Sequence, residues 1–253
     1  MKKAYYYKSY NDDIVQSKKQ EYKLKDGYKW IKNNIFYRFL SCIVYFLFFI
    51  IGNIYIRICL HVKIENKKIL KEYRKNGYFL YGNHTQPIGD VFIPACVCSP
   101  KRIYVEVSQA NLGIPLLGKI LPMLGALPTP DSRADLKKFI EAVKYRINQK
   151  KCVVVYPESH EWPYYTKIRP FNSGAFKIQV NENVPAFCIT TTYYKRKIGN
   201  KPGIKVYVDG PFIVDEKMDR KQKIENLSKE IYNYMTERAK NSNYEYIKYN
   251  EEK

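Results

Sequence analysis

An uncharged apolar stretch near the amino terminus constrains this chain more than any other feature. Residues 39–51 contain no charged side chain, and the apolar character extends over Phe36 to Leu60. As a helix, the uncharged stretch covers about half of a bilayer, and roughly 20 residues are reached only by including Gly52, Asn53 and Arg57. Apolar side chains surround this helix on all sides, whereas a core helix of a soluble protein has one apolar stripe. We therefore expect a membrane-associated helix that either spans the bilayer or lies half-immersed in it.

The rest of the chain alternates short apolar segments with amphipathic helical patterns, which is typical of α/β folds. The clearest helix starts at Ser132, with Asp135 three residues later in a capping-box arrangement, and a last helix covers Asp219 to Ala239. A polar helical stretch is expected from Glu65 to Asn76. Apolar or β-branched runs bounded by Gly, Pro or Asn predict strands at Tyr78–Tyr81, Ile103–Val107, Cys152–Tyr156, Ala186–Thr192 and Ile204–Val208.

These patterns predict three parts of the chain. Residues 1–64 form a polar amino-terminal segment followed by the hydrophobic helix, residues 65–240 form the α/β domain, and residues 241–253 form a tail that we expect to fray.

The charge balance calls for an anionic partner. Lys and Arg number 44 and Asp and Glu number 24, which gives a net charge of +20. Nucleic acid, a phospholipid surface and a phosphorylated substrate all meet this requirement. Nucleic acid is the weakest of the three, because the chain has no helix-turn-helix signature, zinc module or aromatic RNA-binding strand. Part of the lysine surplus also fits a compositional bias that solvates the surface.

The six cysteines indicate a reducing compartment. They lie mostly in apolar runs, without paired metal-ligand spacing or nearby histidines. We expect buried free thiols in a protein that faces the cytosol.

One of only three histidines sits where α/β sheets usually carry their sites. His84 follows the predicted strand Tyr78–Tyr81, at the carboxyl end, and Asp90 comes six residues later. A histidine with a carboxylate in reach takes a proton from a hydroxyl nucleophile, while the carboxylate fixes the tautomer and stabilises the imidazolium. Pro87 suits the first position of a helix, which would put Asp90 in its first turn. The alternative is a histidine that caps a helix end.

The motif blocks that follow appear in a recognisable order. They comprise Asn83–Asp90, Leu116–Pro128, Tyr156–Glu161 with Pro170–Lys177, and Asn183–Ile189. This order resembles the 1-acylglycerol-3-phosphate acyltransferase family of glycerolipid acyltransferases, over roughly Gly77 to Gly210. The resemblance implies a mixed sheet flanked by helices, preceded here by the hydrophobic helix.

The first block of that family is an Asn-His pair with a catalytic aspartate after four intervening residues. Asn83 and His84 match, but five residues separate His84 from Asp90. On a continuous helix one extra residue rotates a side chain by about 100°, so the dyad requires Thr85–Gly89 to absorb the insertion as a turn. The resemblance then implies His84 and Asp90 as catalytic residues and Asn83 at the substrate.

The second and third blocks depart from the family at its arginines. Asp131 stands where the second block has its arginine, and Arg133 follows two residues later. The third block reads aromatic-Pro-Glu-Gly-Thr-Arg in the family. Here Glu158 is kept, His160 is a further substrate-binding candidate, and Glu161 takes the place of the arginine, where it repels an anion.

Replacement cations for the acceptor's anionic group are therefore expected elsewhere. We predict that Arg169 and Lys167 hold this group, with Arg133 assisting, once the loop from Glu158 to Pro170 folds back over the strand end. An arginine fork pairs with phosphate better than an ammonium does. The alternative is that these are ordinary surface cations in a chain of high positive charge.

The implied activity is acyl transfer at the cytoplasmic face of a membrane. A fatty acyl group passes from an acyl thioester, on coenzyme A or acyl carrier protein, to a hydroxyl of a lysophospholipid or glycerol-phosphate-like acceptor. The thioester is a co-substrate, no further cofactor or metal is required, and no nucleic acid takes part. Two alternatives remain: a non-enzymatic basic membrane-binding protein, and a metal-dependent hydrolase using His84, Asp90, Glu158 and His160.

Overall fold

A seven-stranded mixed sheet forms the centre of the protein. The computed structural model describes residues 3–15 and 21–252. The strand order is β2-β8-β7-β3-β6-β4-β5, and every neighbouring pair is parallel except β7 and β8. The strands are β2 Lys63–Glu65, β3 Tyr78–Gly82, β4 Ile103–Val107, β5 Ala126–Pro128, β6 Cys152–Val155, β7 Ala186–Tyr194 and β8 Gly203–Phe212.

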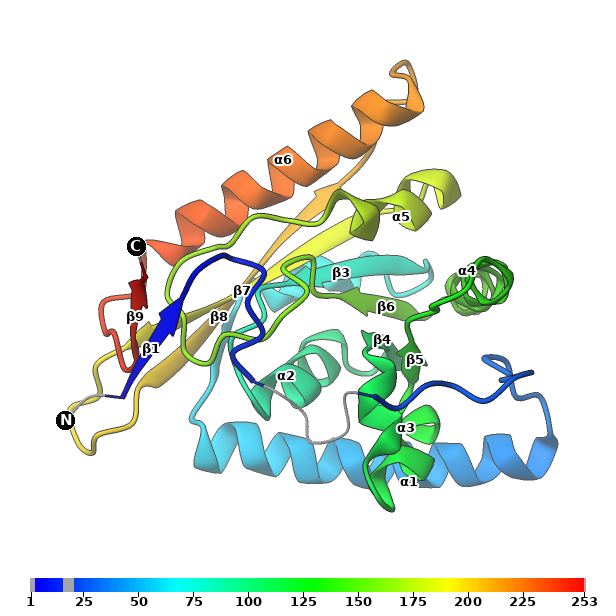
Figure 1. Ribbon diagram of the computed structural model, residues 1–253, viewed down its shortest axis with the longest axis horizontal. Coiled ribbons are helices and arrows are strands. Elements are labelled where there is room, and N and C mark those ends of the chain that lie inside the picture. The colour runs from blue at the N-terminus through cyan, green and yellow to red at the C-terminus, as the bar shows by residue number, and fades with distance from the viewer. Residues whose placement is uncertain (1–2, 16–20, 253) are drawn as a thin grey trace.

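Helices cover both faces of this sheet (Figure 1). The helices are α1 Ile35–Ile54, α2 Gly89–Cys98, α3 Leu117–Leu124, α4 Arg133–Asn148, α5 Lys177–Glu182 and α6 Arg220–Ala239. Alternate residues of β3 separate the two cores: Phe79 and Tyr81 pack on the side of α4, α5 and α6, and Tyr78 and Leu80 on the side of α1 and α2. Burial on both faces explains why the central strands read as continuous apolar runs. The predicted α/β class with a mixed sheet is confirmed.

The longer elements lie where the sequence pattern places them. All five predicted strands are present, with Ile103–Val107 matching at both ends and β7 and β8 extending further. The Ser132 side chain caps α4 by accepting a hydrogen bond from the backbone N–H of Asp135. Asp219 caps α6 within a capping box that Gln222 completes.

The stretch Glu65–Asn76 is not the helix that we predicted. Residues 63–65 instead form β2, which pairs with the edge of the longer strand β8, and Lys67–Lys71 makes only a short 3-10 helix. Asn66 between them has a left-handed backbone (φ 60°), which interrupts any helix.

The two ends of the chain pack against the domain. The tail expected to fray contains β9, Lys248–Glu251, which pairs in parallel with β1, Ala4–Tyr7, as a separate two-stranded sheet. The aromatic rings of Tyr7 and Tyr249 pack against Trp162, and this burial holds the tail in place. The polar amino-terminal segment also contributes Trp30 to the main core, where its Nε1 donates to the carbonyl of Pro128 at 2.9 Å.

The cysteines divide into two groups. Cys96, Cys98, Cys152 and Cys188 are buried free thiols, as expected. Cys42 and Cys59 are exposed, which corrects the prediction for these two. Both belong to the amino-terminal helical segment, and none of the described residues covers them.

Candidate active site

The loop after β3 brings His84 and Asp90 together. His84 Nδ1 lies 2.8 Å from Asp90 Oδ2, and Asp90 is in the first turn of α2. An ionised carboxylate only accepts hydrogen bonds, so Nδ1 carries the proton and Nε2 is left with its lone pair. A histidine held in this way can act as a general base through Nε2.

A turn absorbs the additional residue between the two side chains. The helix starts at Gly89, two residues later than Pro87, so Pro87 lies in the loop and not at the first helical position. The Asp90 N–H donates to the Gln86 carbonyl at 2.9 Å, and the Gln86 N–H donates back to Asp90 Oδ2 at 2.9 Å. These reciprocal bonds set the carboxylate against the imidazole despite the longer spacing.

Tyr156, at the end of β6, supports the pair from one side. Its ring stacks on the His84 ring with a centroid distance of 4.5 Å and an angle of 22°, and its hydroxyl donates to the Asp90 carbonyl at 2.6 Å. The His84 side chain remains 24% exposed. The ring is therefore held in orientation while one edge stays open.

The charges around His84 raise its pKa above the usual value of 6.5. Burial lowers the pKa, but the hydrogen bond and charge of Asp90 and the charges of Glu161 and Glu158 outweigh that effect. A base whose pKa is raised in this way accepts a proton more readily, provided that the pH keeps it neutral beforehand.

Glu158 and Asn83 form hydrogen bonds with the backbone of neighbouring segments. Glu158 Oε2 accepts from the His84 N–H at 3.1 Å, and its two oxygens also bind the backbone and side chain of Arg169. The Asn83 amide exchanges two hydrogen bonds with the backbone of Thr191 in β7. These polar atoms are engaged inside the protein, and the contacts of Glu158 and Asn83 with a substrate stay predictions.

Arg169 is fully buried, and this corrects its predicted contact with the acceptor. Its guanidinium donates to Glu158 Oε2 at 2.9 Å and to the carbonyl of His160, and it stacks over the Trp162 ring at 4.8 Å. Side chains of this ion pair have no solvent exposure. The segment does fold back as expected, since the Trp162 N–H donates to the His84 carbonyl at 3.0 Å. Arg169, which we expected to bind the anionic group of the acceptor, forms an ion pair with Glu158.

The remaining predicted ligands are accessible. Lys167 is exposed, and Arg133 is exposed at the first residue of α4, which starts from the carboxyl edge of the sheet. The His160 ring faces Asp13 at 3.9 Å. Since Glu158 is engaged by Arg169 and His160 faces Asp13, the four residues of the metal-hydrolase alternative do not converge on one centre.

Sequence reasoning treated Glu161 only as a loss, yet it lies close to His84. The backbone N–H of its neighbour Trp162 donates to the His84 carbonyl, and one buried Glu161 carboxylate oxygen has no hydrogen-bond partner among the described residues. Burial raises the pKa of Glu161 to about 7, although the charge of His84 opposes this effect. In the sequence, the closeness of Glu161 to His84 was indicated by its position three residues after Glu158, within the matched third block.

Ser159 adopts a left-handed backbone with φ of 67° at the position where the family block has glycine. This conformation costs a residue with a side chain about 1–2 kcal/mol, and glycine avoids that cost. Glycine also loses more backbone entropy on folding, which cancels part of the gain. We expect Ser159→Gly to raise the free energy of unfolding by about 0.5–1 kcal/mol, measured by denaturant titration. An unchanged or lower midpoint would contradict the strain at this residue.

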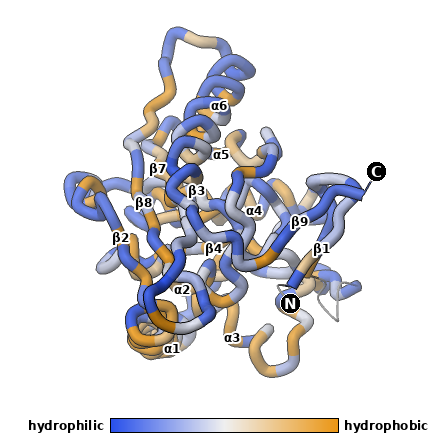
Figure 2. The backbone as a smooth tube through the Cα atoms, turned by 90° about the vertical axis from the view of Figure 1, so that its left-hand side faces the viewer, coloured by the Kyte–Doolittle hydropathy of each residue, from blue (hydrophilic) through white to orange (hydrophobic). Residues whose placement is uncertain are grey.

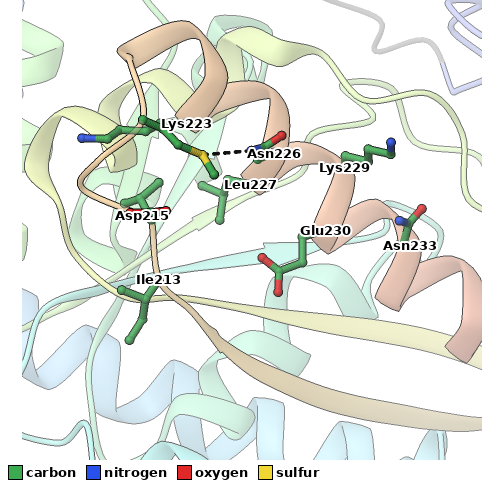
Figure 3. A pocket seen from close by; sticks show the side chains of 10 residues that line it. Ile213, Asp215, Lys223, Asn226, Leu227, Lys229, Glu230 and Asn233 are labelled. Carbon is green, nitrogen blue, oxygen red and sulfur yellow. Dashed lines mark hydrogen bonds between the residues drawn. The ribbon is translucent and has the colours of Figure 1, made fainter.

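A pocket of about 370 Å³ lies between the residues after β8 and the first turns of α6 (Figure 3). Its lining includes Ile213, Asp215 and Lys229 but none of the predicted site residues. The candidate site is the open edge of His84 and not this pocket.

Comparisons with known proteins found a family and a similar fold. The family model "Acyltransferase" matches residues 61–192, which include His84, Asp90 and Glu158. The fold is similar to the crystal structure of the 1-acyl-sn-glycerophosphate (LPA) acyltransferase PlsC from Thermotoga maritima. That structure has a TM-score of 0.54 and 13% identity, and the match covers 83% of this chain and 100% of that one. No curated protein sequence matches the chain significantly. Because the family model covers more than half of its 253 residues, this chain belongs to the acyltransferase family.

Proposed function

We propose that this protein transfers a fatty acyl group from an acyl thioester to a hydroxyl of a lysophospholipid or glycerol-phosphate-like acceptor. The observation that carries the proposal is the 2.8 Å contact between His84 Nδ1 and Asp90, which leaves Nε2 as the base. The family membership supports acyl transfer as the reaction.

The proposed reaction needs no acyl-enzyme. Nε2 of His84 takes the proton of the acceptor hydroxyl as its oxygen attacks the thioester carbonyl carbon. The new C–O bond forms, the C–S bond breaks, and the imidazolium returns its proton to the departing thiolate. Asp90 stabilises the imidazolium between these steps. No cysteine has to react, which agrees with four of the six thiols being buried.

Purified protein in detergent tests the proposal with a matched set of acceptors. The donor is a fatty acyl thioester of coenzyme A or of acyl carrier protein. It is offered with 1-acylglycerol-3-phosphate, other lysophospholipids and glycerol 3-phosphate, and products are identified by mass spectrometry. We expect a new ester on at least one acceptor. If Lys167 and Arg133 bind the acceptor's anion, replacing either one raises KM for a phosphate acceptor more than for uncharged monoacylglycerol.

The pH profile provides an independent check on the base. Since only neutral His84 accepts a proton, kcat/KM should rise with pH through the raised pKa of His84. Removing a nearby negative charge destabilises the imidazolium, so Glu161→Gln should lower this pKa and move the rise to lower pH. If the rise of kcat/KM stays at the same pH in Glu161→Gln, or moves to higher pH, the charge of Glu161 does not raise the pKa of the base.

We also propose that α1 holds the protein at the membrane surface. The segment Ile35–Cys59 is long and apolar enough to cross a bilayer. However, α1 lies along the domain: Ser41 accepts a hydrogen bond from Arg102 at 2.7 Å, and Gly52 packs closely against Phe92 of α2. A spanning α1 would carry the Arg102 guanidinium into the bilayer, which is costly. A helix lying in the interface fits these contacts better.

The outer face of α1 supplies the apolar surface for this contact. Phe39 and Phe46 are 68% and 61% exposed, and Figure 2 shows α1 and α3 as apolar segments at the lower side of the molecule. Replacing both phenylalanines with aspartate should weaken vesicle binding at least about 100-fold, since two buried Phe side chains contribute about 3–6 kcal/mol. Vesicle flotation measures this loss, and His84→Ala serves as the control that keeps binding.

A further inference from the structure

The turn between β7 and β8 presents an isolated apolar side chain at its tip. Strand β7 ends at Tyr194 and strand β8 begins at Gly203. Ile198, in the turn between them, is 88% exposed. Gly199 beside it has φ of +86°, which allows a tight reversal. The side chain therefore stands free at the end of a long hairpin.

Cations surround this side chain without acidic neighbours in the sequence. Lys195, Arg196, Lys197 and Lys201 lie within seven residues that contain no Asp or Glu. Within the described residues, none of the four forms an ion pair. The nearest paired cation, Lys205 in β8, contacts Glu65 at 3.6 Å. The tip is thus a positively charged surface with an apolar centre.

The hairpin is joined to the end of the membrane-associated helical segment. Arg196 Nη2 donates to the carbonyl of Leu60, directly after that segment, at 2.8 Å. Lys63 of β2 then pairs in register with Lys205, the third residue of β8 after the turn. Figure 1 shows the β7–β8 turn at the lower left, on the side of the molecule where α1 ends.

We infer that the β7–β8 turn is a second membrane contact, which binds the headgroups of an anionic lipid bilayer. Ile198 enters the apolar boundary of the headgroup layer, and the exposed Lys195, Lys197 and Lys201 lie against lipid phosphates, while Arg196 ties the turn to Leu60. An anionic bilayer is the occupant favoured by the charge and by continuity with α1. This inference rests on the proposed location of α1 at the membrane and adds lipid charge selectivity to it.

Vesicle binding by the full-length protein tests the inference. The probes are vesicles of phosphatidylcholine alone and of phosphatidylcholine with about one third phosphatidylglycerol. For Lys197→Gln with Lys201→Gln we expect binding to anionic vesicles to fall about 25-fold, since each cation near the surface contributes about fivefold. Binding to neutral vesicles should change less than about twofold, because no anionic surface charge attracts the lysines there.

Matched control variants lie at the opposite end of β8 and on α6. Lys217 and Lys229 are exposed cations, and Ile213 is an isoleucine with 64% exposure (Figure 3). Lys217→Gln with Lys229→Gln removes the same charge and should lower anionic binding less than about threefold, since it acts only through net charge. Ile198→Ser should weaken binding to both vesicle types, whereas Ile213→Ser should not.

Each outcome decides a different claim. Equal losses from the turn variant and from the Lys217 and Lys229 control would overturn the turn as a membrane contact and leave the proposed role of α1 untouched. If replacing Phe39 and Phe46 has no effect while the turn variants do, the turn stands and the proposed role of α1 fails. Turnover on a short-chain soluble thioester and acceptor should be unchanged in all turn variants.

Discussion

His84→Ala should lose acyl transfer by about 10²- to 10⁴-fold, the usual contribution of a general base. The side chain is partly exposed, and among the described residues its hydrogen-bond partner is Asp90, so its removal leaves the core intact. Initial rates of thiol release and ester formation on a verified acceptor measure the loss, and circular dichroism checks the fold.

Asp90→Asn and His160→Ala provide the graded comparison. Asp90→Asn keeps the shape but removes the charge that stabilises the imidazolium, so it should lose less activity than His84→Ala. His160 faces Asp13 and not the His84–Asp90 pair, so its replacement should change kcat by less than about tenfold. Near wild-type turnover in His84→Ala, or a larger loss from His160→Ala, would contradict this assignment of the base.

Arg169→Ala should lower the free energy of unfolding by about 3–5 kcal/mol, because removing one partner of a buried ion pair strands the other charge. Glu158 and Arg169 have no exposed side-chain surface, and Glu158 also holds the His84 N–H. Lys167→Ala, two residues away and exposed, should change stability by less than about 0.5 kcal/mol. Denaturant unfolding in the same detergent compares the two variants.

A different result for Arg169→Ala would support the prediction from the sequence that Arg169 binds the anionic group of the acceptor. If Arg169→Ala keeps wild-type stability and instead raises KM selectively for anionic acceptors, Arg169 reaches the ligand. Reduced kcat together with reduced stability fits its place behind Glu158, since that carboxylate positions the loop that carries His84.

Local pattern predicted the central sheet but not its edges. The run Cys152–Val155 is buried on both faces, so its apolar character alone identifies a strand. By contrast, the sequence Ala-Tyr-Tyr-Tyr of β1 has no alternation of apolar and polar residues, and its partner β9 lies at the other end of the chain. The three-residue strands β2 and β5 are too short to give a period.

The site shows the same division between local and distant contacts. His84 and Asp90 are six residues apart, so a turn formed by the intervening Pro87 and Gly89 could be anticipated from the sequence. The burial of Arg169 could not, because it depends on how the loop after β6 folds beneath the His84 segment. In a chain of net charge +20, one buried arginine looks like any surface cation.

The stoichiometry of a single-turnover reaction tests the proposed chemistry most directly. Enzyme, acyl thioester and an accepted lyso-lipid are mixed, and free thiol, free fatty acid and new ester are quantified together for the wild type and for His84→Ala. The proposed mechanism predicts one ester per thiol released, no covalent acyl-enzyme, and loss of both products in the variant. Thiol released with fatty acid in place of ester, or ester formation that persists in His84→Ala, would contradict it.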